Sequence, residues 1–226
     1  MTTLSVSGTA THRHRAERGV VRLALGFEGA DREQVLRDSV ALHERVADEA
    51  TAHRRQGAAT WWSADQVTVG PVPGAWQDDG TRASSSTVRS RSAVTVRFAD
   101  FAVLAEWVGA LAALDGVAVE GVEWSLSHDR RPEVERAARV AAVADAVARA
   151  GDYAEALGLG TPQLQALWEP GLRPGGGGTG GAGSGGGPAL FARSATSGGP
   201  DDGSLAFALA PADVEVHAEV GADFVA

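Results

Sequence analysis

Two histidine groups in the sequence have a spacing that could support chemistry. His12 and His14 lie two positions apart on a predicted strand, so both imidazoles would share one face and could begin a metal site. No third ligand lies nearby in the sequence, and the flanking arginines disfavour a bound cation. His128 precedes Asp129, and such a pair could orient a general base, although Asp129 is equally suited to begin a helix. We therefore interpret both groups as structural.

A glycine tract contains two further patterns that resemble functional motifs. Residues 176–181 satisfy the G-x-G-x-x-G pattern of dinucleotide sites, but no predicted strand leads into them and no amphipathic helix follows. Ser184 lies in an approximate nucleophile elbow that also lacks the required strand and helix. We expect neither pattern to function, and we assign no catalytic, cofactor-binding or metal-binding residue.

The composition of the 226-residue chain excludes several classes of function. All 20 basic residues are arginine, so lysine Schiff bases, phosphate-loop lysines and Ser-Lys dyads are excluded. Cysteine is absent, which removes disulfides, thiolate metal sites and cysteine nucleophiles. The net charge of -9 disfavours nucleic acid as a partner, because that affinity depends on basic patches. Whole classes of enzyme and several cofactors are therefore excluded, and we expect no bound cofactor.

The hydropathy of the chain predicts an ordinary globular protein with no membrane span. Hydrophobic residues make up 44% of the chain and charged residues 22%, as in typical soluble domains. Residues 1–15 alternate small and polar side chains and contain no apolar run of signal-peptide length. We therefore expect a cytoplasmic location.

Alternating apolar and polar residues predict the strands of a mainly antiparallel sheet with packed helices, which is an α+β fold. The first two strands are predicted to be joined by a hairpin-like turn at residues 16–19, and a parity change predicts a bulge at Glu120 and Gly121. The predicted strands cover residues 4–15, 19–28, 66–72, 87–98, 117–127 and 213–225.

Capping residues and a period near 3.6 predict three helices. Asp31 and Asp100 are predicted N-caps of the first two, and Pro132 lies in the first turn of a third that reaches Leu157. The third helix is rich in small residues, which would let its axis lie close to the sheet. The side chains predicted to face the sheet are Ala137, Val140, Ala141, Ala144, Val147, Ala148 and Ala154.

Charged and aromatic side chains mark candidate contact surfaces. Three arginines on the 87–98 strand point away from its buried valines, and this face could bind an anion or an acidic strand, or simply be solvated: Arg89, Arg91 and Arg97. Glu215 and Glu219 point outward from the last strand and would complement the arginines if the two strands pair or meet across subunits. Trp61 and Trp62 cannot both face inward from one strand, so they are candidates for contact with a partner or ligand. Capping of the core is the alternative role for this pair.

One segment is compositionally distinct from the rest of the chain. Glycine and polar residues dominate residues 169–204, which we interpret as a long flexible Gly-rich insertion before the C-terminal strand. Closing such a loop costs only about 3 kcal/mol, so a folded domain tolerates it. We therefore predict a single domain over residues 1–226.

A distributed set of small and apolar positions carries a family resemblance. The positions are the Val6-Ser7-Gly8-Thr9-Ala10 strand, Val67-x-Val69-x-Pro71, Val94-x-Val96 with the Asp100 helix, Val122-x-Trp124-x-Leu126, Asp129, Arg136-Ala137-Ala138, Ala154 and Leu157-Gly158. With these residues, nearly the whole chain outside the insertion resembles the SIMPL-domain family of oxidative-stress-defence and periplasmic-immunogenic proteins. The resemblance implies an antiparallel sheet with packed helices, no established catalytic residues, a tendency to form homo-oligomers and a loose association with stress defence.

We therefore expect a non-enzymatic protein that acts through homo-oligomeric assembly or through binding of a protein partner. The alternative is a small-ligand or anion-binding protein that uses the arginine face and the tryptophan pair. An enzyme, such as a hydrolase, is the third reading, and a convergent set of titratable groups in one apolar cleft would favour it.

Overall fold

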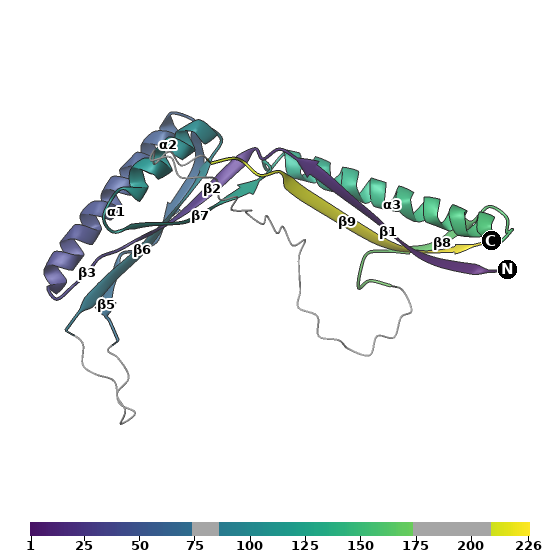
Figure 1. Cartoon of the computed structure of the whole chain (residues 1–226), viewed down its shortest axis with the longest axis horizontal. Coiled ribbons are helices and arrows are strands. Elements are labelled where there is room, and N and C mark those ends of the chain that lie inside the picture. Colours follow the sequence, from purple (N-terminus) through teal and green to yellow (C-terminus); the bar gives the residue numbers. More distant parts are fainter. Residues whose placement is uncertain (74–85, 174–208) are drawn as a thin grey trace, which may run out of the picture. The chain divides into compact units, whose positions relative to one another are not determined.

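The structure, a computed structural model, describes residues 1–73, 86–173 and 209–226, and these residues form two compact units. The first unit contains residues 1–15, 126–173 and 213–226, and the second contains residues 16–73, 86–125 and 209–212. Each unit has its own sheet and its own helices (Figure 1). Every strand pair in the described residues is antiparallel, which confirms the predicted α+β class.

The sheet of the first unit has three strands, with the last strand of the chain in the middle. Strand β9 (Val214–Val225) pairs with β1 (Thr3–His14) on one side and with β8 (Gln163–Trp168) on the other. The β1–β9 register runs without interruption from Thr3 opposite Val225 to His14 opposite Val214. The predicted alternation of β9 is confirmed, because Val214, Val216 and Val220 are buried while Glu215 and Glu219 are exposed.

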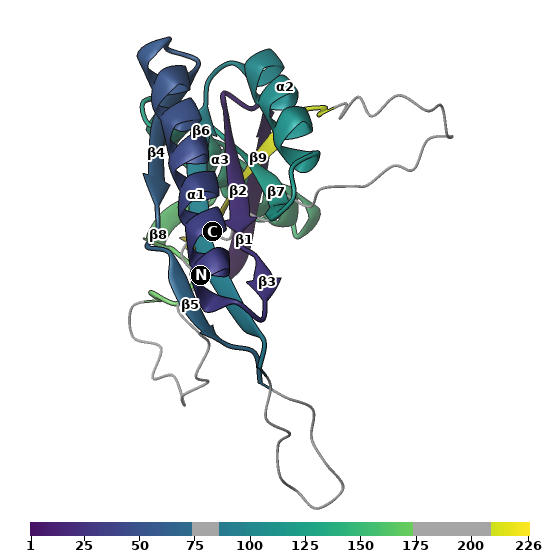
Figure 2. The same cartoon turned by 90° about the vertical axis from the view of Figure 1, so that its left-hand side faces the viewer.

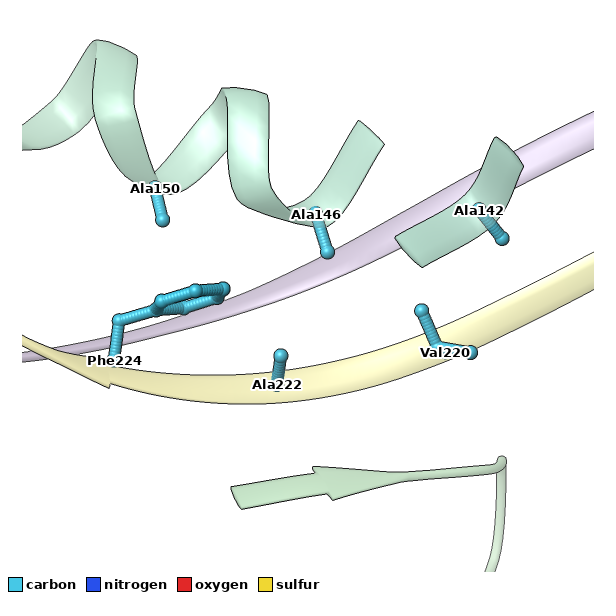
Figure 3. Close-up of a cluster of buried hydrophobic side chains, with 6 residues drawn as sticks. All are labelled: Ala142, Ala146, Ala150, Val220, Ala222 and Phe224. Carbon is cyan, nitrogen blue, oxygen red and sulfur yellow. The ribbon is translucent and has the colours of Figure 1, made fainter. Parts of the chain in front are cut away.

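Helix α3 (Arg130–Ala156) covers one face of this sheet along β1 and β9. Pro132 lies in its first turn, and Gly158, with a φ of 65°, follows its C-cap, so both predicted ends are confirmed. Alanines at a constant spacing of four residues line the buried side, where Ala142, Ala146 and Ala150 face Val220, Ala222 and Phe224 (Figure 3). A Cβ at Gly8 of β1 would lie 2.1 Å from the Ala142 carbonyl oxygen, so the helix backbone touches the strand backbone there.

The predicted inner stripe of α3 is wrong except at Ala154, which is buried, and Ala141, which is half-buried. Val140 is 62% exposed and Val147 is 50% exposed, and Ala137, Ala144 and Ala148 are exposed too. The side chains that the structure buries are Val134, Ala138, Ala142, Ala146, Ala150 and Ala154. The reason is steric: at a helix-to-strand approach this close, a methyl group fits where the larger valine side chain does not.

The predicted hairpin between the first two strands is also wrong. Strand β1 pairs only with β9 in the described residues, whereas β2 (Arg18–Leu25) belongs to the sheet of the second unit. Alternation identifies both strands but does not show which strands they pair with. The boundary between the units falls between Arg15 and Ala16.

The second unit is built around β6 (Val88–Phe98), the strand with the most neighbours. On one side β6 pairs with β2, which in turn pairs with β7 (Val117–Ser125). The other strands that pair with β6 are short: β3 (Glu28–Gly29), β4 (Ala59–Ala64) and β5 (Thr68–Pro71). The predicted bulge in β7 is confirmed, because Arg22 lies opposite Gly121 and Leu23 opposite Val119.

Helices α1 (Arg32–Arg55) and α2 (Phe101–Ala112) pack on the same face of this sheet (Figure 2). Helix α1 contacts mainly β4 and β6, and α2 contacts β2 and β7. The carboxylates of Asp31 and Asp100 accept hydrogen bonds from the first backbone amides of the two helices, which confirms both predicted N-caps. No helix among the described residues covers the other face of this sheet, the open face, which carries Trp61 and the arginines of β6.

Part of the predicted insertion lies outside the described residues. The structure describes residues 169–173 of the segment 169–204, and the patterns at residues 176–181 and Ser184 fall in the remainder. The single domain over residues 1–226 stays a prediction, which depends on whether the two units unfold together.

Candidate functional site

The open face of the β6 sheet carries four of the predicted site residues, which are Trp61, Arg89, Arg91 and Arg97. Directly paired residues of antiparallel strands share a face, and Trp61 of β4 lies opposite Arg97 of β6. The Arg97 guanidinium carbon is 5.4 Å from the centroid of the Trp61 ring, a cation–π arrangement. Arg91 lies on the same face, six residues along β6, opposite Thr68 of β5.

Trp61 and Trp62 lie on opposite faces of the sheet. Trp61 is 40% exposed on the open face, whereas Trp62 is half-buried opposite Val96 on the helix side. The argument that two adjacent indoles cannot share one strand face is therefore correct. Trp61 is the member of the pair that a partner could reach without rearrangement.

The arginines of the open face differ in their partners. Arg89 forms an ion pair with Glu28 of β3, and Arg22 of β2 forms one with Glu123 of β7 at 3.2 Å. Arg91 and Arg97 are exposed and form no ion pair with the residues that the structure describes. These two guanidinium groups are therefore available to an external carboxylate or phosphate.

A hollow of about 400 Å³ lies beside Arg91. It is lined by residues 68–73 of β5 and the segment after it, together with Arg89 and Arg91. Since Arg89 forms an ion pair with Glu28, the positive charge of the hollow that has no ion-pair partner among the described residues is that of Arg91.

Glu215 and Glu219 do not face the arginines within one sheet. Both lie on the exposed face of β9 in the first unit, and β9 pairs with β1 and β8 rather than with β6. Glu215 accepts an ion-paired hydrogen bond from Arg13 of β1 at 2.7 Å. The pairing of the two strands within the chain is thus excluded, and contact between the two charged surfaces across subunits stays a prediction.

Two carboxylates of the first unit have shifted acidities. The backbone N–H of Thr9 donates to Asp145 of α3 at 2.9 Å and Arg149 pairs with the same carboxylate, which lowers the pKa of Asp145. Hydrogen bonds from Ser5 and Arg173 likewise lower the pKa of Asp223. The Asp145 contact uses an outward N–H of β1, a strand at the edge of its sheet, and so blocks that edge to further pairing.

The histidines are dispersed over the described part of the chain. The rings of His12 and His14 stack 6.4 Å apart on β1, and no group of three or more possible metal ligands occurs among residues 1–73, 86–173 and 209–226. The His53 ring packs against Phe98 and Trp107 in the second unit, with ring centroids 5.5 and 5.4 Å away.

Sequence reasoning missed the outer surface of α3 as a candidate contact site. Because Val140 and Val147 were assigned to the buried side, the exposed apolar strip that they form was not considered. The signal that identifies it is the run of alanines at residues 138, 142, 146, 150 and 154, whose constant spacing of four fixes the buried side.

These features define an α+β protein with two antiparallel sheets, whose candidate residues lie on open sheet faces and on a helix surface. The family model described as "SIMPL: Protein of unknown function (DUF541)" matches residues 4–224, so the chain belongs to the SIMPL family. The resemblance found in the sequence is thereby confirmed. None of the curated proteins compared with the chain matches it. No helix among the described residues is long and apolar enough to cross a bilayer.

Proposed function

We propose that this SIMPL-family protein acts through assembly with copies of itself, and that the open face of the β6 sheet is a contact surface. The observation that carries the proposal is Trp61, a large aromatic side chain left 40% exposed beside Arg97, which forms no ion pair with a described residue. Tryptophan and arginine are the residue types that most often dominate the binding energy of an interface.

A second copy of the chain offers the chemistry that this surface would recognise. Arg91 and Arg97 favour an acidic partner, and the chain has a net charge of -9. The exposed face of β9 carries Glu219, which forms no ion pair with a described residue. Each copy therefore holds both a basic surface and an acidic surface, as head-to-tail or symmetric assembly requires.

Light scattering on size-separated protein tests the proposal. The wild-type mass is expected to be a multiple of 23.2 kDa, and Trp61→Ala is expected to weaken association by roughly thirtyfold, since central indoles contribute about 2 kcal/mol. High salt alone should leave the assembly largely intact, because exposed ion pairs contribute only about 0 to 1 kcal/mol.

A matched control tests whether the loss of association is specific to the open face or follows from removing any exposed apolar side chain. Leu36 is 43% exposed on α1, which packs on the other side of the sheet, so Leu36→Ala should leave the mass unchanged. An equal loss of mass in Leu36→Ala and Trp61→Ala would contradict the assignment to the open face. A monomeric wild type would contradict assembly itself.

The hollow beside Arg91 supports a second candidate function, the binding of a small anion. Its volume of about 400 Å³ falls within the range of small-molecule sites. Calorimetric titration with inorganic phosphate tests this alternative. Binding that is saturable in the wild type and lost in Arg91→Ala would support it, whereas no heat in the wild type would reject it.

A further inference from the structure

The outer surface of α3 presents one row of side chains with a self-complementary order. Residues at a spacing of four form a continuous ridge on a helix, and the ridge opposite the buried alanines reads Arg136, Val140, Ala144, Ala148, Asp152. All five residues are exposed, and Val140 is 62% exposed. The ridge thus has a basic end, an apolar middle and an acidic end.

The two charged ends of this ridge have no ion-pair partners in the described residues. The other arginines of α3 that form ion pairs are engaged along the helix, as in the pair of Arg149 with Asp145 at 2.9 Å. Arg136 and Asp152 form none. An exposed apolar ridge between opposite charges that form no ion pair with a described residue is an arrangement that suits contact with a second copy of the chain.

We propose that two copies of the chain pair through α3 in an antiparallel arrangement, with Ala144 next to a two-fold axis. This inference rests on the proposed self-assembly and names a further surface for it. Antiparallel alignment about Ala144 places Val140 of one copy against Ala148 of the other, and Arg136 against Asp152. A parallel alignment would instead place like charges together.

The small side chains of the ridge suit this contact. Ridges of residues four apart pack into each other when helices cross at about -50°, the commonest class of helix packing. Alanines at the crossing point permit a short distance between the helix axes, while Arg136, eight residues away, has a long side chain that reaches the diverging partner helix. A contact through one helix per copy is small, so the association should depend on concentration.

Cysteine cross-linking gives a direct test, because the chain has no cysteine of its own. Ala144→Cys should form a disulfide-linked dimer on mild oxidation. Val140→Cys alone should cross-link poorly, because antiparallel copies would hold the two thiols about 12 Å apart along the helix, whereas a mixture of Val140→Cys and Ala148→Cys should link efficiently. Ala137→Cys, an exposed control seven residues from Ala144, should not link with itself, because antiparallel copies would hold its two thiols about 21 Å apart along the helix.

Charge reversal tests the ends of the ridge. Arg136→Glu and Asp152→Arg should each weaken association about tenfold, since two ion pairs per dimer become repulsive. The double variant should restore the wild-type mass, because the swapped charges again face each other. Circular dichroism should be unchanged, because Arg136 and Asp152 are both exposed.

The outcomes separate this inference from the proposed self-assembly. A wild type that is oligomeric while Ala144→Cys fails to cross-link, or while the double charge reversal fails to rescue, would overturn the α3 pairing and leave assembly through the β6 sheet in place. Efficient linking of Val140→Cys with itself would overturn the antiparallel order. A monomeric wild type would overturn both proposals.

Discussion

At the scale of single residues, a glycine determines how closely α3 approaches its sheet. Gly8 is the buried residue of β1, and a Cβ there would lie 2.1 Å from the Ala142 carbonyl oxygen and 2.7 Å from the Ala146 methyl group. Real Cβ atoms do not approach backbone oxygens so closely, so any side chain at this position must push the helix away.

Gly8→Ala should therefore destabilise the protein by about 1 to 3 kcal/mol, the usual cost of overpacking. Chemical denaturation followed by circular dichroism measures this loss. Ser7→Ala on the neighbouring, exposed position should change the free energy of unfolding by less than about 0.5 kcal/mol. Equal stability of the two variants would show that the helix does not press on β1.

A carboxylate on α3 makes the first unit sensitive to acid. The pKa of Asp145 lies below its usual value of 3.8 because the carboxylate accepts the Thr9 N–H and pairs with Arg149. A lowered pKa in the folded state means that the stabilisation is present above pH 3.8 and is lost as the pH falls through the lowered value.

Asp145→Asn should therefore reduce stability at neutral pH, and the difference from wild type should shrink as the pH falls below 3.8. Denaturation curves at neutral and acidic pH measure that difference. Glu219→Gln, an exposed carboxylate on β9 without an ion-pair partner in the described residues, is the control. A difference for Asp145→Asn that is constant with pH would contradict the assignment.

At the scale of elements, local sequence patterns predicted where the strands and helices lie, but they predicted less well which strands pair with one another. Asp31, Asp100, Pro132 and Gly158 mark helix ends by local geometry, so the sequence alone located them correctly. Strand β1 pairs with β9, more than 200 residues away in the sequence, and no local pattern contains that information.

The prediction of which side of α3 faces the sheet was wrong for a different reason. Both sides of the helix are apolar, so hydrophobicity could not decide which side faces the sheet. Side-chain size decided it, since alanines rather than valines occupy the side that contacts Gly8. Among the candidate residues, alternation placed Arg91 and Arg97 correctly on an exposed face, whereas the partner of Arg89 required the tertiary pairing with β3.

The C-terminal strand should be essential for the fold. Strand β9 lies between β1 and β8 and buries Val214, Val216 and Val220. Burial of each valine contributes roughly 1.5 to 3 kcal/mol, so their sum approaches the 5 to 15 kcal/mol of a typical domain. Removal of residues 213–226 should unfold the first unit, seen as loss of protection of the α3 backbone amides from hydrogen exchange. A truncation in which those amides stay protected would contradict this role.

At the scale of the whole molecule, each of the two units carries one of the surfaces that we propose for self-association. The β6 sheet offers Trp61 and Arg97 on its open face, and α3 offers a ridge that is basic at Arg136 and acidic at Asp152. A tryptophan that is central to a contact dominates its energy, and the charges select the orientation of the partner.

The most direct test of this account is the molar mass of the wild-type protein across a dilution series. At roughly tens of micromolar, where weak and moderate interfaces are populated, light scattering should give a multiple of 23.2 kDa that falls towards the single-chain mass on dilution. A mass of 23.2 kDa at every concentration would contradict self-assembly and would favour the binding of a small anion beside Arg91.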